Sequence, residues 1–197
     1  MPPEEAFCVL VQLLTHYQLR FLFIEGMEGV HIRMCQLELL MKEYLPSLHQ
    51  HFQQLDLKGT MFASSWFLTL FANNLPLEPI FRIFDVLLLE GSGTLFNFSL
   101  ALLKRSQSEL LKLNFEESLE YLKDKLYDKF TGPDDFLEEA FRFKLPPKKL
   151  DRLEKEARGY VDAKSQEEKL IHSLTQALFF LYFSFFLFSF FFSVVET

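Results

Sequence analysis

Histidine and cysteine are the residue types to consider first, because imidazole and thiolate groups serve as metal ligands, general bases and nucleophiles. His49 and His51 are two residues apart in a predicted helix, so they point to different faces. The remaining histidines are isolated and are interpreted as surface or packing side chains: His16, His31 and His172. No pair of His or Cys residues has the spacing of a zinc site. The sequence therefore predicts no catalytic residue and no metal site.

Gly91-Ser92-Gly93 is a candidate for phosphate binding, since glycine-rich loops let backbone N–H groups surround a phosphate. The segment lacks the further glycine and the lysine that such a loop requires. We therefore expect no cofactor-binding residue and no cofactor.

Charged residues at helical spacing form one further candidate. Glu78, Arg82 and Asp85 follow one another at intervals of four and three, so they share a helix face. One interpretation is a solvated ladder, in which each pair contributes about 0.2–0.5 kcal/mol. The other is a half-buried link, in which Arg82 ties the helix to a neighbour or meets a carboxylate of a partner.

The element that carries these charges lies in the stretch around which the chain is organised, Met61 to Gly91. Residues 62–71 are apolar on nearly every side and include Trp66, the single tryptophan. The sequence breaks at residues 73–76, and a second helical run ends at Gly91. Helices that are apolar almost all round lie inside proteins, so this stretch predicts the middle of an all-helical core.

Apolar spacing of three and four residues predicts further helices at 2–17, 30–44, 48–54, 95–104, 115–130 and 134–143. Ser106-Gln107-Ser108-Glu109 is similar to a capping box that opens a short helix, and Asn114 with Glu117 forms a weaker cap for the helix at 115. No segment alternates with a period of two, so no strand is predicted. The expected fold class is all-α.

Composition limits the function classes. The 197 residues include 25 Phe and carry a net charge of −7, which gives no basic surface for nucleic acid. Cys8 and Cys35 lie in apolar helical patterns and are expected to be buried thiols in a reducing compartment. The N-terminus has no basic region typical of a signal peptide, so a cytoplasmic protein is expected.

We predict three parts: a helical domain at residues 1–145, a charged helical linker at 146–176 and a Phe-rich segment at 177–195. The last part, Ala177 to Val195, has 19 residues without a charge and would nearly span a bilayer as a helix. It is either a C-terminal membrane anchor or a translated pyrimidine tract, since Phe, Leu and Ser codons can consist of pyrimidines. In either case such a segment aggregates or inserts when exposed to water.

The central stretch resembles a known family. The string at residues 66–71 (Trp-Phe-Leu-Thr-Leu-Phe), followed by Pro76-Leu77, Arg82, Asp85 and Glu90-Gly91, is similar to the C-terminal motif of TBC domains, the all-helical catalytic domains of Rab GTPase-activating proteins. The resemblance covers about residues 1–145 and implies a Rab-type GTPase as partner and a role in vesicle traffic.

The resemblance also implies what to look for as catalytic machinery. TBC proteins supply an arginine from an Ile-x-x-Asp-x-x-Arg motif and a glutamine from a Tyr-x-Gln motif, and an arginine finger raises GTPase rates by about 10³–10⁵. Neither motif occurs in this sequence, and Met1 aligns just after the glutamine motif. We therefore expect the C-terminal part of such a domain, incompetent in catalysis alone. The alternative is a non-catalytic helical adaptor, tethered to a membrane by residues 177–195.

Overall fold

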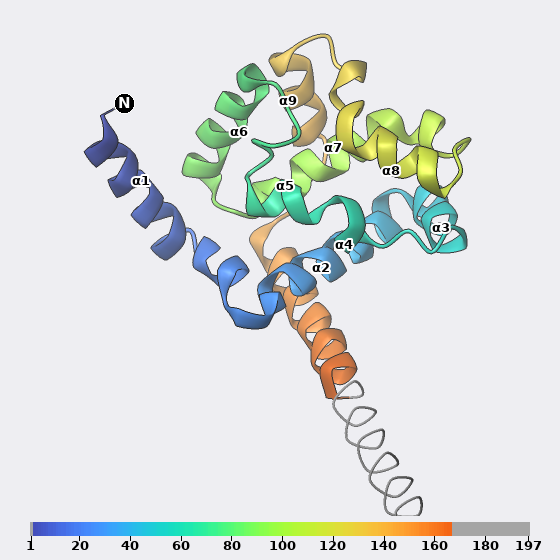
Figure 1. Cartoon of the computed structure of the whole chain (residues 1–197), viewed down its shortest axis with the longest axis horizontal. Coiled ribbons are helices and arrows are strands. Elements are labelled where there is room, and N and C mark those ends of the chain that lie inside the picture. Colours follow the sequence, from blue (N-terminus) through green and yellow to red (C-terminus); the bar gives the residue numbers. More distant parts are fainter. Residues whose placement is uncertain (1, 167–197) are drawn as a thin grey trace, which may run out of the picture. The chain divides into compact units, whose positions relative to one another are not determined.

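The structure is a computed structural model that describes residues 2–166 (Figure 1). The described chain is helical and contains no strand, so the predicted all-α class is confirmed. The chain divides into two units, Met1–Arg158 and Gly159–Thr197, and the contacts described below lie in the first. Its helices are α1 (Pro3–Thr15), α2 (Glu28–Tyr44), α3 (Pro46–Gln54), α4 (Gly59–Phe62), α5 (Ser64–Leu68), α6 (Leu77–Glu90), α7 (Thr94–Leu110), α8 (Phe115–Asp124) and α9 (Pro133–Phe141). Short 3-10 turns cover Leu19–Phe23, Glu25–Met27 and Tyr127–Lys129, and residues 147–158 are helical.

Local sequence signals explain where several helices begin. Helices α1, α3 and α9 each have a proline in the first turn, where the missing N–H has no intrahelical partner to lose. At α8 the predicted capping box is confirmed: the Glu117 N–H donates to Asn114 Oδ1 at 3.0 Å, and the Asn114 N–H donates to Glu117 Oε2 at 3.1 Å.

The other predicted capping box, at Ser106, is wrong. Helix α7 runs through this residue without a break, and the Ser106 side chain is fully buried. A capping serine must lie outside the regular helix, with its hydroxyl free to accept a backbone N–H. Packing of the long apolar face of α7 therefore overrides the local capping signal.

The apolar run at 62–71 also differs from the single helix expected. It contains the last residue of α4, all of α5 and then a turn in which Leu70 and Phe71 have φ of 51° and 66°. The Phe71 N–H donates to the Trp66 carbonyl at 2.8 Å, which closes the helix end with Leu70 in the left-handed position that glycine usually takes. Left-handed backbone costs roughly 1–2 kcal/mol per non-glycine residue. Burial of both side chains offsets that cost.

The core lies around α2, α5 and α7. Trp66 is fully buried and belongs to a chain of ring contacts that also contains Phe52, Phe62 and Phe71. Its ring lies 5.3 Å from Phe62 and stacks on Phe71 at 5.8 Å. Aromatic pairs of this kind contribute about 0.5–1.5 kcal/mol beyond the burial of their area. The prediction that this stretch is the middle of the core is confirmed for its first half, around Trp66; in the second half one side of α6 is exposed.

The charged segment after Pro146-Pro147 is helical in the described residues and contacts α2. Leu153 and Ala157, part of its thin apolar seam, are buried, and Arg33 on α2 pairs with Glu154 at 3.0 Å. These contacts join the first turns of the charged helix to the helical unit. The predicted domain boundaries at 145 and 176 stay predictions.

The two cysteines do not share the buried environment expected of them. Cys8 is exposed, because α1 buries a single residue, Leu13, and Cys8 lies on another face. Cys35 on α2 is half-buried, and its pKa is raised to about 11, mainly by burial and further by Glu38 and Glu156. A thiol with this pKa stays protonated at neutral pH and is a poor nucleophile.

Among residues 2–166, no helix has both the length and the apolar character needed to cross a membrane. The Phe-rich segment at 177–195, for which a membrane anchor is one of the two expectations, lies outside the described residues.

Candidate protein-interaction surface

Helix α6 has an apolar face on each side. Ile80, Ile83 and Leu87 point inward and are buried. The opposite side carries large apolar residues that water reaches, and Phe81 is 59% exposed and Leu89 85% exposed. Leu77, Phe81 and Leu88 are spaced at four and seven residues, so they form one stripe along the helix.

Helix α1 carries a second exposed stripe. Phe7, Leu10 and Val11 are exposed, although the apolar spacing that predicts the helix at 2–17, which includes Phe7 and Leu10, is typical of a helix with one buried face. In Figure 1, α1 lies at one edge of the helical unit, away from α7, α8 and α9. The expected inward face is therefore only partly covered within the described residues.

A hydrogen bond joins the segment just after α1 to the end of α6. The Tyr17 hydroxyl, just after α1, donates to the carbonyl of Leu88 near the end of α6 at 2.8 Å. We call the exposed residues of both helices the α1–α6 surface: Phe7, Leu10, Val11, Leu77, Phe81, Leu88 and Leu89. Exposed large apolar residues gathered on one helix face mark sites where proteins contact other molecules.

The predicted stripe of charges lies along α6 beside this surface. Arg82 is half-exposed; its Nη1 lies 3.9 Å from Asp85 and its Nη2 lies 3.5 Å from Asp134, in the first turn of α9. Both interpretations from sequence therefore apply in part, as an i,i+3 surface pair and as a link to a neighbouring helix. Because all three side chains are well exposed, each contact contributes between about 0 and 1 kcal/mol. Glu78 makes no ion pair within the part of the chain that the structure describes.

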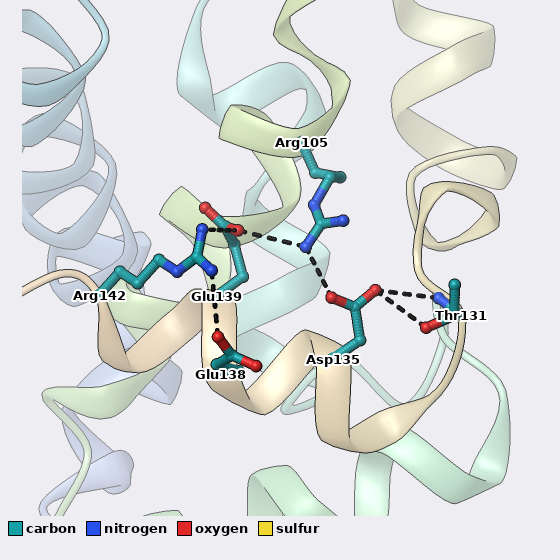
Figure 2. A network of polar contacts seen from close by, with 6 residues as sticks. All are labelled: Arg105, Thr131, Asp135, Glu138, Glu139 and Arg142. Carbon is teal, nitrogen blue, oxygen red and sulfur yellow. Dashed lines mark hydrogen bonds and ion pairs between the residues drawn. The ribbon is translucent and has the colours of Figure 1, made fainter.

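Behind α6, a polar network fixes α9 against α7. Figure 2 shows Arg105 of α7 reaching two carboxylates one turn apart on α9. Its Nη2 lies 2.7 Å from Asp135 Oδ1 and 3.2 Å from Glu139 Oε2. The guanidinium also lies 4.9 Å from the centre of the Phe130 ring. Glu139, 8% exposed, receives a second hydrogen bond from Arg142, so its carboxylate is doubly paired.

Asp135 receives three donors in this network. Its Oδ2 accepts the backbone N–H of Thr131 at 3.0 Å and the Thr131 hydroxyl at 3.3 Å, while its Oδ1 accepts from Arg105 (Figure 2). The Thr131 N–H, followed by Arg105, lowers the pKa of Asp135 below its ordinary value. This network is not predicted from the sequence. Carboxylates four residues apart on a predicted helix were its available signal.

The histidines, which are predicted to have no catalytic role, lie apart from one another in the fold. His51 bonds the carbonyl of Leu113 at 3.1 Å, and His31 bonds that of Met27 at 3.0 Å. His172 lies outside the described residues. Between residues 2 and 166, no group of three or more His, Cys, Asp or Glu side chains is placed to hold a metal ion.

Comparison with known proteins gives several relatives of similar sequence. Ecotropic viral integration site 5 protein of Mus musculus is 41% identical over 168 residues, which is 85% of this chain and 20% of the relative. Rab GTPase-activating protein tbc-11 of Caenorhabditis elegans is 37% identical over 171 residues, 85% of this chain and 18% of the relative. GTPase activating protein Gyp51 of Schizosaccharomyces pombe is 41% identical over 160 residues, 77% of this chain and 16% of the relative.

The chain therefore spans a fifth or less of the length of these relatives. The family model for the RabGAP TBC domain matches residues 1–158, which cover the unit that carries the α1–α6 surface. The family resemblance read from the Trp66 motif is thus confirmed, and Trp66 and Phe67 are buried core residues of the fold. The chain belongs to the RabGAP TBC domain family.

Proposed function

We propose that this chain is the C-terminal part of a Rab GTPase-activating domain and regulates a Rab-type GTPase in vesicle traffic. The observation that carries the proposal is the match of residues 1–158 to the family model for the RabGAP TBC domain. The names of two relatives, a Rab GTPase-activating protein and a GTPase activating protein, support it. In this proposal Trp66, Phe67, Arg82 and Asp85 maintain the fold and do not touch the reacting phosphate.

We further propose that the chain alone does not accelerate GTP hydrolysis. Neither the arginine motif nor the glutamine motif expected of TBC domains occurs in the sequence. Without them there is no group to neutralise charge developing on the phosphates or to position water, a contribution of about 10³–10⁵ in rate for the arginine. In this proposal Arg82 is not the finger, because it precedes Asp85, whereas the arginine of the expected motif follows its aspartate.

The α1–α6 surface offers a place where the missing catalytic motifs could bind. Its exposed apolar stripes suit another helical segment, and burial of apolar area contributes about 25 cal/mol per Å². We propose that a segment carrying the arginine and glutamine motifs packs on this surface. The complete catalytic unit would then be assembled from the two parts.

Single-turnover hydrolysis by Rab GTPases preloaded with GTP tests the proposal. We expect the full chain to leave the intrinsic rate unchanged, while GTPase activating protein Gyp51 serves as the active control. Addition of a separate segment that contains both motifs is expected to raise the rate. Stimulation by the full chain alone would contradict the proposed lack of activity, and loss of that stimulation in Arg82→Ala would show that Arg82 acts on the nucleotide.

The uncharged segment at 177–195 favours a second candidate, a non-catalytic adaptor that is tethered to a membrane. We propose a cytoplasmic chain whose helical unit would be held at a membrane by this segment. Fractionation of cells that express the chain with and without residues 177–197 tests the tether. If both forms stay in the soluble fraction, the tether is excluded and the segment has no anchoring role.

A further inference from the structure

A cavity of about 340 Å³ lies between α2, α3 and the turn that leads to α4. We call it the α2–α3 pocket. Its apolar wall consists of buried side chains from these segments and from α4 itself, which are Met41, Phe52, Leu57 and Phe62. The rings of Phe52 and Phe62 meet edge to face with their centres 5.6 Å apart. None of the lining residues belongs to the α1–α6 surface, so the pocket is a separate feature of the fold.

A single carboxylate from α2 faces this apolar wall. Glu38 lines the pocket and is half-buried, and its Oε1 accepts the backbone N–H of Gly59 at 3.0 Å. Within the described chain, Glu38 has no cationic partner at salt-bridge distance. An ionised carboxylate has about four acceptor positions, so most of its capacity remains unused. A half-buried anion beside apolar side chains gains more from a cation than a fully solvated one does.

The other charged groups of the pocket do not neutralise Glu38. Lys58 and Asp56 are exposed at the rim and lie 3.5 Å apart, so their charges compensate each other. Burial lowers the pKa of His49, an effect that Glu38 opposes and the nearby Lys42 reinforces. His49 is therefore predominantly neutral at neutral pH. Within the described chain, Lys42, four residues after Glu38 on α2, does not line the pocket and forms no ion pair with Glu38, so Glu38 is the one charged lining residue without an ion-pair partner.

The combination of one carboxylate and two aromatic rings matches a particular cation. A guanidinium group is planar, stacks on aromatic faces and is weakly hydrated, whereas an ammonium group holds its water more tightly. The volume lies at the lower end of ligand cavities, which run from about 300 to 1,000 Å³, so it suits one side chain rather than a cofactor. We propose that the α2–α3 pocket binds the arginine side chain of a partner protein, with its guanidinium on Glu38 and its stem against Phe52 and Phe62. This proposal does not depend on the GTPase-activating function.

Nuclear magnetic resonance of the full ¹⁵N-labelled chain, kept soluble in mild detergent, tests the proposal. The probes are a blocked glycine-arginine-glycine peptide and the same peptide with citrulline, which keeps the shape and removes the charge. We expect the arginine peptide to shift the amide signals of Gly59 and His49 and to bind about tenfold more tightly than the citrulline peptide. Equal affinity for the two peptides, or shifts confined to other regions, would overturn the proposal.

Variants identify the carboxylate, and a small molecule identifies the source of the guanidinium. Glu38→Gln keeps an acceptor for the Gly59 N–H, so the fold is retained while the affinity for the arginine peptide falls about tenfold. Glu116→Gln removes the same charge from an exposed position on α8 and is expected to leave the affinity unchanged. Equal loss in both variants would contradict the site. Binding of agmatine without binding of the arginine peptide would exclude a partner protein as the source.

Discussion

Two apolar regions of similar composition have opposite environments in this fold. The segment from α4 to the turn after α5 places Trp66 and Phe71 in the interior, where neither is exposed. The outer face of α6 places Phe81 and Leu89 in water. The first region adopts left-handed backbone at Leu70 and Phe71 and buries its rings, while the second is a regular helix that leaves Phe81 and Leu89 exposed.

The difference shows that apolar content alone does not separate a core from an interface. A core residue contacts other side chains of the same chain, so its truncation lowers the free energy of unfolding. An interface residue contacts a partner molecule, so its truncation weakens association with that partner. Stability and association measured for matched substitutions therefore distinguish the two regions.

The largest effect is expected for Trp66→Ala. Removal of a fully buried indole that contacts Phe62 and Phe71 leaves a cavity that the strained turn fills poorly. We expect the free energy of unfolding to fall by about 3–5 kcal/mol, as for other buried aromatic residues. Urea denaturation of the full chain followed by circular dichroism measures this change. A loss below about 1 kcal/mol would show that the Trp66 cluster does not hold the core together.

The core was the more predictable of these two regions. The density of apolar residues around Trp66 indicated burial, and Asn114 with Glu117 indicated the start of α8. The turn at Leu70 was not predictable, because neither residue in the left-handed region is glycine or asparagine and tertiary packing selects their backbone. The capping box predicted at Ser106 was wrong for the same reason, because burial of the apolar face of α7 outweighs the local capping signal.

The surface was less predictable, because periodicity identifies an apolar face without showing what covers it. Helix α1 illustrates this: Leu13 is covered by the fold and Phe7 is not, although both lie in one amphipathic pattern. The Arg105 network depends on contacts 30 and 34 residues apart in sequence, which spacing rules within a helix do not reach. The pocket at Glu38 likewise needs three segments to meet.

A second prediction concerns the polar network in which Arg105 of α7 pairs with α9. Arg105→Met keeps much of the side-chain volume but removes the cation that pairs Asp135 and Glu139. Glu139 is then left nearly buried with Arg142 alone. We expect a loss of about 1–3 kcal/mol in the free energy of unfolding. Arg142→Met, at an exposed arginine of the same network, is the matched control and should cost less than about 1 kcal/mol. An equal loss of free energy of unfolding in the two variants would show that any surface charge stabilises the fold to this extent.

The same network predicts a dependence on pH. The pKa of Asp135 is lowered in the folded chain by the Thr131 N–H and by Arg105, so the ionised carboxylate favours folding. Its contribution is fully present above the pKa of the unfolded chain, about 3.9, and is lost as the pH falls through the lower folded value. Denaturation at about pH 7 and about pH 3 should therefore show that Asp135→Asn destabilises the chain at the higher pH and much less at the lower. A difference independent of pH would mean that the carboxylate charge is not what stabilises α9.

The smallest effect on stability is expected on the outer face of α6. Replacement of Phe81 and Leu89 by serine removes side chains that are 59% and 85% exposed, so the free energy of unfolding should change by less than about 0.5 kcal/mol per site. Self-association should fall instead, because exposed apolar area drives aggregation. Light scattering of the two variants against the parent chain measures this second effect.

This pair of measurements decides what the α1–α6 surface is. If both serine variants keep their stability, associate less and lose the rate increase given by the added segment with the arginine and glutamine motifs, the surface acts as an interface. Ile83→Ser, on the buried side of the same helix, is the matched control and should instead destabilise the fold by more than about 2 kcal/mol. A large destabilisation by Phe81→Ser would show that this side chain is covered in the folded chain. The contrast between the Trp66 cluster and the α6 face would then disappear.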